Sequence, residues 1–114
     1  MGQAAMLLEQ SKQQDIVNYM PNKEVIESLA NYFSAFSDST RLKILSALAI
    51  SKMCVSDISM VLDINQTTIS HQLKILKDQG LLKCIRDGKV ILYSVATPTI
   101  NDVMLSGVDY LLEQ

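Results

Sequence analysis

Residues 54–93 read CVSDISMVLDINQTTISHQLKILKDQGLLKCIRDGKVILY, and the local patterns in this stretch decide the fold. The segment 56–62 predicts a helix of barely two turns, and apolar spacing over 66–79 predicts a longer second helix. Asn65 is a good N-cap for the longer helix, and Gly80 is a good residue to end it. A two-turn helix is marginal alone in water, so it must pack on its neighbours, and the short linker holds the two helices at a steep angle.

After the second helix the periodicity changes. The runs 82–85 and 90–93 are β-branched or apolar and flank Asp87 and Gly88, a pair that favours a type I′ turn because glycine tolerates positive φ. This pattern predicts a two-stranded hairpin. Helix, tight linker, second helix and hairpin in that order are typical of a winged helix-turn-helix, whose second helix enters the DNA major groove. The basic residues at the predicted hairpin tip are Arg86 and Lys89.

Three helices are predicted before this stretch. The first covers about residues 4–19 and is rich in Gln. Asn22 caps the second, whose apolar stripe at helical spacing must be buried. The third takes its N-cap from residues 37–39, ends near 51–52 and is apolar on most of its surface, which indicates a central position. The stripe of the second helix is Val25, Ile26, Leu29, Ala30, Phe33 and Phe36.

A last helix follows the hairpin. Pro98 opens it, as is typical of the first helical position. The helix is too apolar for a solvated tail. Its apolar residues are Ile100, Val103, Met104, Val108, Leu111 and Leu112. The fold class is therefore mainly α, with six helices and a small β-hairpin between the fifth and the sixth.

Length and composition set bounds on function. The 114 residues, 48% of them hydrophobic, suit one compact domain and exclude a multidomain enzyme. A monomer of this size buries only about two thirds of its unfolded surface, so association would stabilise it. Apolar runs reach about four residues, against roughly 20 for a bilayer span, and the N-terminus lacks a secretion signal. We therefore expect a cytoplasmic protein that does not contact membranes.

The charges are distributed unevenly. The net charge is −2, but residues 66–94 carry five basic and two acidic side chains, whereas the remainder carries five basic and ten acidic ones. A domain with one basic binding face and an acidic back has this asymmetry. A solvated surface is the alternative interpretation.

The second helix of the motif has two different faces. Ile69, Leu73 and Leu76 recur at core spacing, and the 100° step places a polar set on the opposite side. Hydroxyl, imidazole and ammonium groups there offer donors and acceptors to base edges and phosphates. For His71, the only histidine, we favour DNA contact over a structural role. The polar set is Thr67, His71, Lys74 and Asp78, with Thr68 and Ser70 on its flanks.

Five motifs occur in the order that is found in one family: AFSDSTRLKIL at 35–45, CVSDI at 54–58, QTTISHQLKIL at 66–76, GLL at 80–82 and RDGK at 86–89. Over about residues 25–93 the chain thereby resembles the ArsR/SmtB family of bacterial transcriptional repressors. The resemblance implies a winged-helix homodimer that occupies a palindromic operator in double-stranded DNA and leaves it when an inducer binds.

The resemblance also implies roles for particular segments. The chain is then one winged-helix domain, 1–114, in which 1–21 and 97–114 form the dimerisation helices around a core at 22–96. Arg86 and Lys89 of the hairpin reach adjacent phosphates. The DNA contacts that it implies on the second helix are Gln66, Thr67, Thr68, Ser70, His71 and Lys74.

The inducer sites of the family are incomplete in this sequence. Metal-sensing members carry Cys-Val-Cys where this chain has Cys54-Val55-Ser56, and soft ions need three or four thiolate or imidazole ligands. The last helix contains no His. We interpret Cys54 and Cys84 as packed apolar residues, with redox sensing left open. Asp102, Asp109 and Glu113 share one helix face, and we take them as solvated acids rather than ligands of a hard cation.

The sequence therefore predicts a DNA-binding repressor with an unidentified inducer, no cofactor and no metal site. The alternative is a winged helix that serves only protein interaction or dimerisation. A basic hairpin tip beside a polar helix face favours the first, because an interaction module would more often present an apolar patch there. An enzyme is not expected, because no paired nucleophile and base and no phosphate-binding glycine loop is visible.

Overall fold

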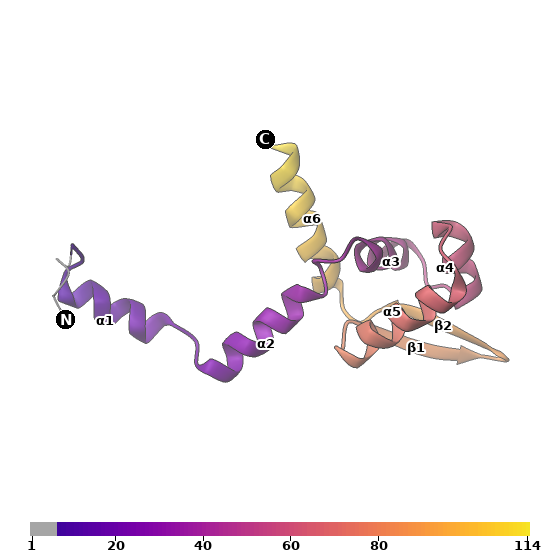
Figure 1. The fold of residues 1–114 in the computed structure, drawn as a ribbon, viewed down its shortest axis with the longest axis horizontal. Helices are drawn as coiled ribbons and strands as arrows, with labels where there is room; N and C mark the ends of the chain where they lie inside the picture. Colours follow the sequence, from indigo (N-terminus) through magenta and orange to yellow (C-terminus); the bar gives the residue numbers. More distant parts are fainter. Residues whose placement is uncertain (1–6) are drawn as a thin grey trace. The chain divides into compact units, whose positions relative to one another are not determined.

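The computed structural model describes residues 7–114, and within this range the chain forms six helices and one antiparallel two-stranded sheet (Figure 1). This confirms the predicted fold class and order of elements. Contacts divide the chain into two compact units, Met1–Ala30 and Asn31–Gln114. The elements are α1 (Gln10–Tyr19), α2 (Lys23–Ser34), α3 (Ser39–Ile50), α4 (Val55–Leu62), α5 (Gln66–Asp78), β1 (Leu82–Asp87), β2 (Val90–Val95) and α6 (Pro98–Leu112).

The first unit contains α1 and most of α2. Helix α1 begins at Gln10 rather than at residue 4, and residues 4–6 lie outside the described part of the chain. The physical reason is the extended backbone of Glu9, whose ψ of 148° prevents the helix from continuing toward the N-terminus. The predicted end of the helix at Tyr19 is confirmed.

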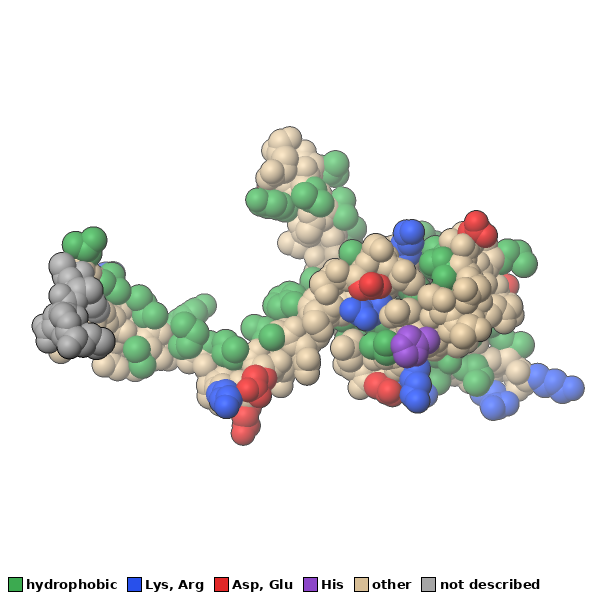
Figure 2. Space-filling model, viewed as in Figure 1, with side chains coloured by type: hydrophobic (Ala, Val, Ile, Leu, Met, Phe, Trp, Pro, Cys, Tyr) green, Lys and Arg blue, Asp and Glu red, His purple; other side chains and the backbone are tan. Residues whose placement is uncertain are grey.

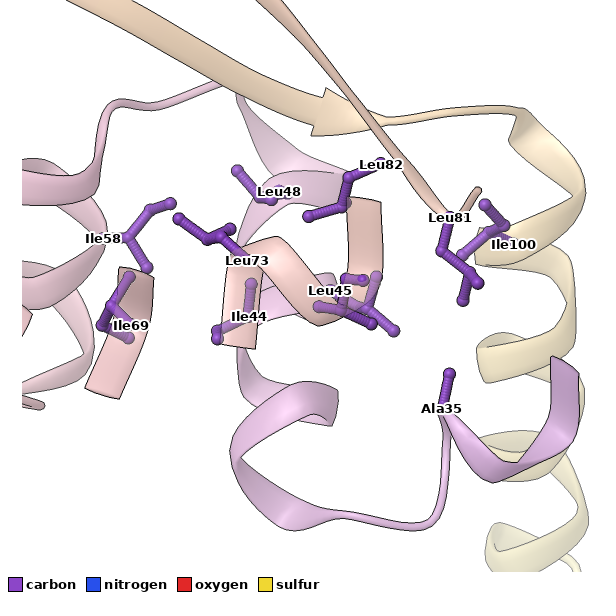
Figure 3. Close-up of a cluster of buried hydrophobic side chains, with 11 residues drawn as sticks. Ala35, Ile44, Leu45, Leu48, Ile58, Ile69, Leu73, Leu81, Leu82 and Ile100 are labelled. Carbon is purple, nitrogen blue, oxygen red and sulfur yellow. The ribbon is translucent and has the colours of Figure 1, made fainter. Parts of the chain in front are cut away.

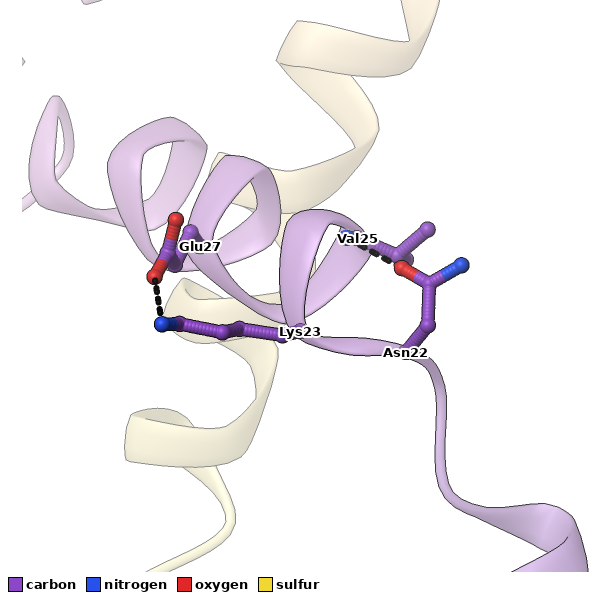
Figure 4. Close-up of polar contacts among 4 residues, drawn as sticks. All are labelled: Asn22, Lys23, Val25 and Glu27. Atoms are coloured by element: carbon purple, nitrogen blue, oxygen red, sulfur yellow. Dashed lines mark hydrogen bonds and ion pairs between the residues drawn. The ribbon is translucent and has the colours of Figure 1, made fainter.

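The predicted cap of α2 is confirmed. Asn22 Oδ1 accepts a hydrogen bond from the Val25 N–H at 2.9 Å, which satisfies one of the free amides in the first turn (Figure 4). Across the first turn of the same helix, the Lys23 ammonium lies 4.0 Å from Glu27 Oε1. Both side chains of this ion pair are exposed, so it contributes little to stability.

The apolar stripe of α2 is not buried, and the prediction that it must be buried is wrong for the single chain. Helical spacing shows that apolar side chains share a face, but it does not show what covers that face. Packing begins at the C-terminal end of the helix, where Tyr32 is half-buried against the core, and continues beyond it with the buried Ala35 and the half-buried Phe36. The exposed fractions in the stripe are 49% for Val25, 40% for Ile26, 45% for Leu29 and 51% for Phe33.

The second unit is organised around one cluster of buried apolar side chains (Figure 3). Helix α3 supplies its centre, as its apolar surface predicted, and Ile44 and Leu45 are fully buried. Asp38 caps this helix by accepting the Arg41 N–H at 3.0 Å, within the predicted capping segment. The buried cluster consists of Ala35, Ile44, Leu45, Leu48, Ile58, Ile69, Leu73, Leu76, Leu81, Leu82 and Ile100.

A tight turn connects α4 to α5. Asp63 adopts the left-handed conformation, with φ 54° and ψ 49°, and ends α4 where a glycine is more usual. The Ile64 N–H donates back to the Ser59 carbonyl at 3.1 Å, and the Ser59 hydroxyl donates to the Ile64 carbonyl. These reciprocal bonds fix the linker between the two helices.

Gly80 ends the α5 segment, as predicted. Its φ is +80°, and its N–H donates to the Lys77 carbonyl at 2.9 Å. The next residue, Leu81, donates its N–H to the Leu76 carbonyl at 3.0 Å and buries its side chain in the core. This pair of bonds is a Schellman motif, and it directs the chain from α5 into β1.

The hairpin is longer than predicted, and its turn lies one residue later. Asp87 pairs with Val90, so the two loop residues are Gly88 and Lys89 rather than Asp87 and Gly88. Only Gly88 in this turn has positive φ, at +63°, which excludes the predicted type I′ turn because that turn needs positive φ at both positions. Pairing continues past the apolar runs because backbone hydrogen bonds do not require apolar side chains.

Helix α6 begins at Pro98, as predicted, and Ile100 in its first turn is buried. Toward its C-terminal end the apolar residues are exposed, with Val108 at 49%, Leu111 at 68% and Leu112 at 79%. None of the helices within residues 7–114 has both the length and the apolar character that a membrane crossing requires.

Candidate nucleic-acid interface

Helix α5 carries the candidate recognition surface. Its N-terminus is fixed by Asn65, whose Oδ1 accepts the Thr68 N–H at 2.8 Å, as the sequence predicted. Ile69, Leu73 and Leu76 are buried against the core, also as predicted. Because these three residues anchor one side of the helix, the orientation of the opposite side is determined by packing.

The polar side of α5 faces solvent. The structure leaves the hydroxyls, imidazole and ammonium of this side exposed on one rigid helix, and only Thr68 on its flank is half-buried. These groups lie within the second unit, so the structure brings together the α5 side chains that are predicted to contact DNA. The exposed members are Gln66, Thr67, Ser70, His71, Lys74 and Asp78.

The hairpin β1–β2, which we call the wing, carries the second part of the surface. Arg86 is exposed on β1 and pairs with Ile91, whereas Lys89 is exposed in the turn itself. Lys and Arg side chains project from the wing tip in Figure 2. Lys89 also lines a groove of about 320 Å³ together with Cys54 and Ser56 at the start of α4. Lys89 therefore lies beside the start of α4 and adds a positive charge to this side of the helix-turn-helix.

Both cysteines are half-buried free thiols. Cys54 is the N-cap residue of α4, and its carbonyl accepts the Ile58 N–H at 3.1 Å. Cys84 pairs with Tyr93 in the wing. A hydrogen bond from the exposed Lys77 ammonium to the Cys84 sulfur, together with their charge interaction, raises the pKa of Lys77 above its usual value.

The acidic residues of α6 and its C-cap lie on one face, as their spacing predicted. Asp102, Asp109 and Glu113 line a shallow depression of about 470 Å³ with Tyr110. In the described part of the chain, no three side chains from His, Cys, Asp and Glu are grouped closely enough to hold a metal ion.

The structure adds Ser56 to the residues that sequence patterns identified. Gln66 Nε2 donates a hydrogen bond to the Ser56 hydroxyl at 3.4 Å, which links the first turns of α4 and α5. The sequence analysis identified Ser56 only as the residue that stands where metal-sensing family members carry a cysteine ligand. No local pattern signals a contact between residues on two different helices.

Comparison with known proteins identifies the family. The sequence model for bacterial regulatory proteins of the arsR family matches residues 38–83, which contain α3, α4, α5 and the start of the wing. The transcriptional repressor SdpR of Bacillus subtilis is 40% identical over 72 residues, covering 63% of this chain and 80% of SdpR. The chain belongs to the ArsR family.

Two further ArsR-family comparisons agree. A transcriptional repressor SmtB homologue of Synechocystis is 36% identical over 87 residues, and the match covers 76% of this chain and 66% of that relative. The solution structure of a homodimeric winged helix-turn-helix domain of Mycobacterium bovis, a possible ArsR-family regulator, is similar with a TM-score of 0.70 and 25% identity. That match covers 82% of this chain and 88% of the other.

Membership of the ArsR family decides between the alternatives left open by the sequence. The chain is a DNA-binding transcriptional regulator with a winged helix-turn-helix, and a module for protein interaction alone is not favoured. The family consists of transcriptional regulators and not of enzymes.

Proposed function

We propose that this ArsR-family protein is a repressor that binds a palindromic operator as a homodimer and is released by an inducer. The observation that carries the proposal is the two-sided character of α5, which buries Ile69, Leu73 and Leu76 and exposes a polar face beside the basic wing tip. A rigid helix with this character is suited to the major groove. The similar SdpR and SmtB-homologue proteins are both named transcriptional repressors.

Each part of the surface has a separate task in this proposal. Side chains of α5 read base edges, which present different donors and acceptors in the major groove. Arg86 and Lys89 of the wing contact phosphates, which adds affinity without sequence preference. The proposed contacts on α5 are Gln66, Thr67, Thr68, Ser70, His71 and Lys74.

The apolar surface supports a dimer. Val108, Leu111 and Leu112 of α6 are exposed, and a groove lined by Val103 and Met104 runs beside them. A second copy that covers this surface removes it from water, and each Å² of apolar surface removed from water contributes about 25 cal/mol of favourable free energy. We assign this role to 97–114 and to the N-terminal segment 1–21, around a core at 22–96. The homodimeric state of the similar Mycobacterium bovis domain supports a dimer here as well.

Dimerisation determines the form of the operator. A twofold axis places two copies of α5 on the same side of the DNA, so the operator must be a palindrome. The centres of its half-sites lie about one helical turn of roughly 34 Å apart, or a multiple of that distance.

Selection from a random duplex pool tests the proposal. The full chain is expected to enrich one palindromic sequence, and Thr67→Ala or His71→Ala should alter the base preference within each half-site. Losing a good contact to a base changes discrimination by about 1 to 3 kcal/mol. Glu24→Ala, at an exposed position on α2 outside the proposed DNA contacts and dimerisation segments, is the control and should select the same sequence. Enrichment of no sequence by the wild-type protein would contradict the proposal.

A further inference from the structure

Gln66 and Ser56 are joined across the helix-turn-helix. Gln66 is the first residue of α5, Ser56 is the second residue of α4, and the Gln66 amide nitrogen donates to the Ser56 hydroxyl at 3.4 Å. Both side chains are exposed, and both line a groove of about 480 Å³ at the α4–α5 turn. The hydrogen bond therefore lies on the surface that the proposed function presents to DNA.

The backbone that holds Ser56 is well fixed. Helix α4 is anchored by Ile58, which is fully buried, and its end is locked to the linker by the reciprocal bonds between Ser59 and Ile64. Helix α5 is in turn held by its buried Ile69. The Ser56 hydroxyl is thus carried on a fixed backbone by a short side chain, and it can anchor the longer and more flexible side chain of Gln66.

A glutamine side chain has several rotatable bonds, and ordering it on binding costs conformational entropy. A bond to a fixed hydroxyl removes part of that freedom before DNA arrives. The Gln66 amide has two N–H donors and one carbonyl acceptor, and Ser56 occupies one donor. The remaining N–H and the Oε1 are the pair that matches N7 and the N6 amino group of adenine in the major groove.

We propose that Ser56 is a positioning residue that orients the Gln66 amide for reading one adenine in each half-site. The inference rests on the proposed function, because it assigns a task within the same DNA-binding surface. Ser56 acts through Gln66 and not through its own contact with a base. Its contribution consequently depends on the presence of the amide.

A double-mutant cycle tests this dependence. The affinities of wild type, Ser56→Ala, Gln66→Ala and the double variant are measured by fluorescence anisotropy on the selected operator and on a scrambled duplex. Ser56→Ala should weaken operator binding by about two- to tenfold, the range for one net hydrogen bond. It should leave scrambled-duplex binding unchanged. In the Gln66→Ala background the same substitution should have no effect.

Two further variants separate positioning from stability. Ser56→Thr keeps a hydroxyl and should restore affinity to within about twofold of wild type. Ser51→Ala, which removes an exposed hydroxyl after α3, is the matched control and should not change affinity. Thermal unfolding of each variant verifies the fold. We expect the alanine variants to fold, because alanine is well tolerated in a helix.

The outcomes are distinguishable. Positioning by Ser56 is wrong if Ser56→Ala weakens operator binding equally with and without Gln66. It is also wrong if Ser56→Ala leaves operator affinity unchanged while Gln66→Ala reduces it. In both cases the proposed DNA-binding function stands. If Gln66→Ala has no effect on the operator, Gln66 does not read a base and the inference fails. If the wild-type chain selects no operator, the proposed function itself fails.

Discussion

Met53 and Tyr93 exchange two backbone hydrogen bonds, in which the Met53 N–H donates to the Tyr93 carbonyl at 3.1 Å and the Tyr93 N–H returns a bond at 2.8 Å. This isolated bridge attaches the connection between α3 and α4 to strand β2. The wing is thereby held to the helix-turn-helix by main-chain bonds as well as by side-chain packing. Its position relative to α4 is accordingly determined by the fold.

Breaking this bridge should destabilise the protein. Met53→Pro removes the amide that donates to Tyr93, and we expect the free energy of unfolding to fall by about 1 to 3 kcal/mol. Met53→Leu keeps the amide and a similar volume, so it should remain close to wild type. Urea unfolding followed by circular dichroism measures both. Equal stability of the proline variant and the wild type would show that the bridge is unimportant.

The N-cap of α5 should contribute measurably to stability. Asn65→Ala leaves the Thr68 N–H without its acceptor, and this should lower the free energy of unfolding by about 1 kcal/mol. Asn65→Asp retains an oxygen at the same place and should preserve most of that stability. Chemical denaturation compares the two variants, and an alanine variant as stable as the wild type would contradict the prediction.

Operator binding should depend strongly on salt, because Lys and Arg displace counterions from phosphates. In the double variant Arg86→Ala and Lys89→Ala, affinity should fall for all sequences. The slope of log affinity against log salt should become shallower by about one for each lost phosphate contact. Anisotropy titrations from low to moderate salt measure the slope. The paired change of Lys23 and Lys43 to Ala removes equal charge from exposed positions on α2 and α3, outside both the wing and the proposed dimerisation segments, and it serves as the control. An unchanged slope in the wing variant would exclude the wing from the interface.

The exposed end of α6 should mediate dimerisation. Val108→Asp and Leu111→Asp place charges on side chains that are 49% and 68% exposed in the single chain, so the fold should tolerate them. In a dimer the same charges would be buried without partners, which is costly. We expect sedimentation equilibrium to show monomers for both variants. Ile50→Asp, at an even more exposed site on α3, should remain dimeric. Dimeric α6 variants would place the interface elsewhere.

Arsenite, Zn²⁺ and Cd²⁺ should not release the protein from its operator through the usual sites of the family. A single thiol at Cys54, followed by Ser56 in place of a second one, provides too few ligands for a soft ion. Each ion is titrated against a labelled operator complex, with Cys54→Ser as the control. Stoichiometric release by micromolar metal that disappears in Cys54→Ser would overturn the prediction.

Several features of the fold and site were determined by the sequence alone. The caps at Asn22, Asp38 and Asn65 and the stop at Gly80 all lie where local patterns predicted them. The buried face of α5 was also correct. These signals act over at most one or two helical turns, so the interacting residues are close in the sequence and their chemistry can be interpreted without the fold.

The tertiary structure decided the remaining features. The turn at Gly88 and Lys89 follows from the register between two strands, and the bridge between Met53 and Tyr93 joins segments that are distant in the sequence. The bond from Gln66 to Ser56 likewise depends on how α4 packs against α5. Periodicity identifies which residues share a face, whereas only packing in three dimensions establishes what that face contacts.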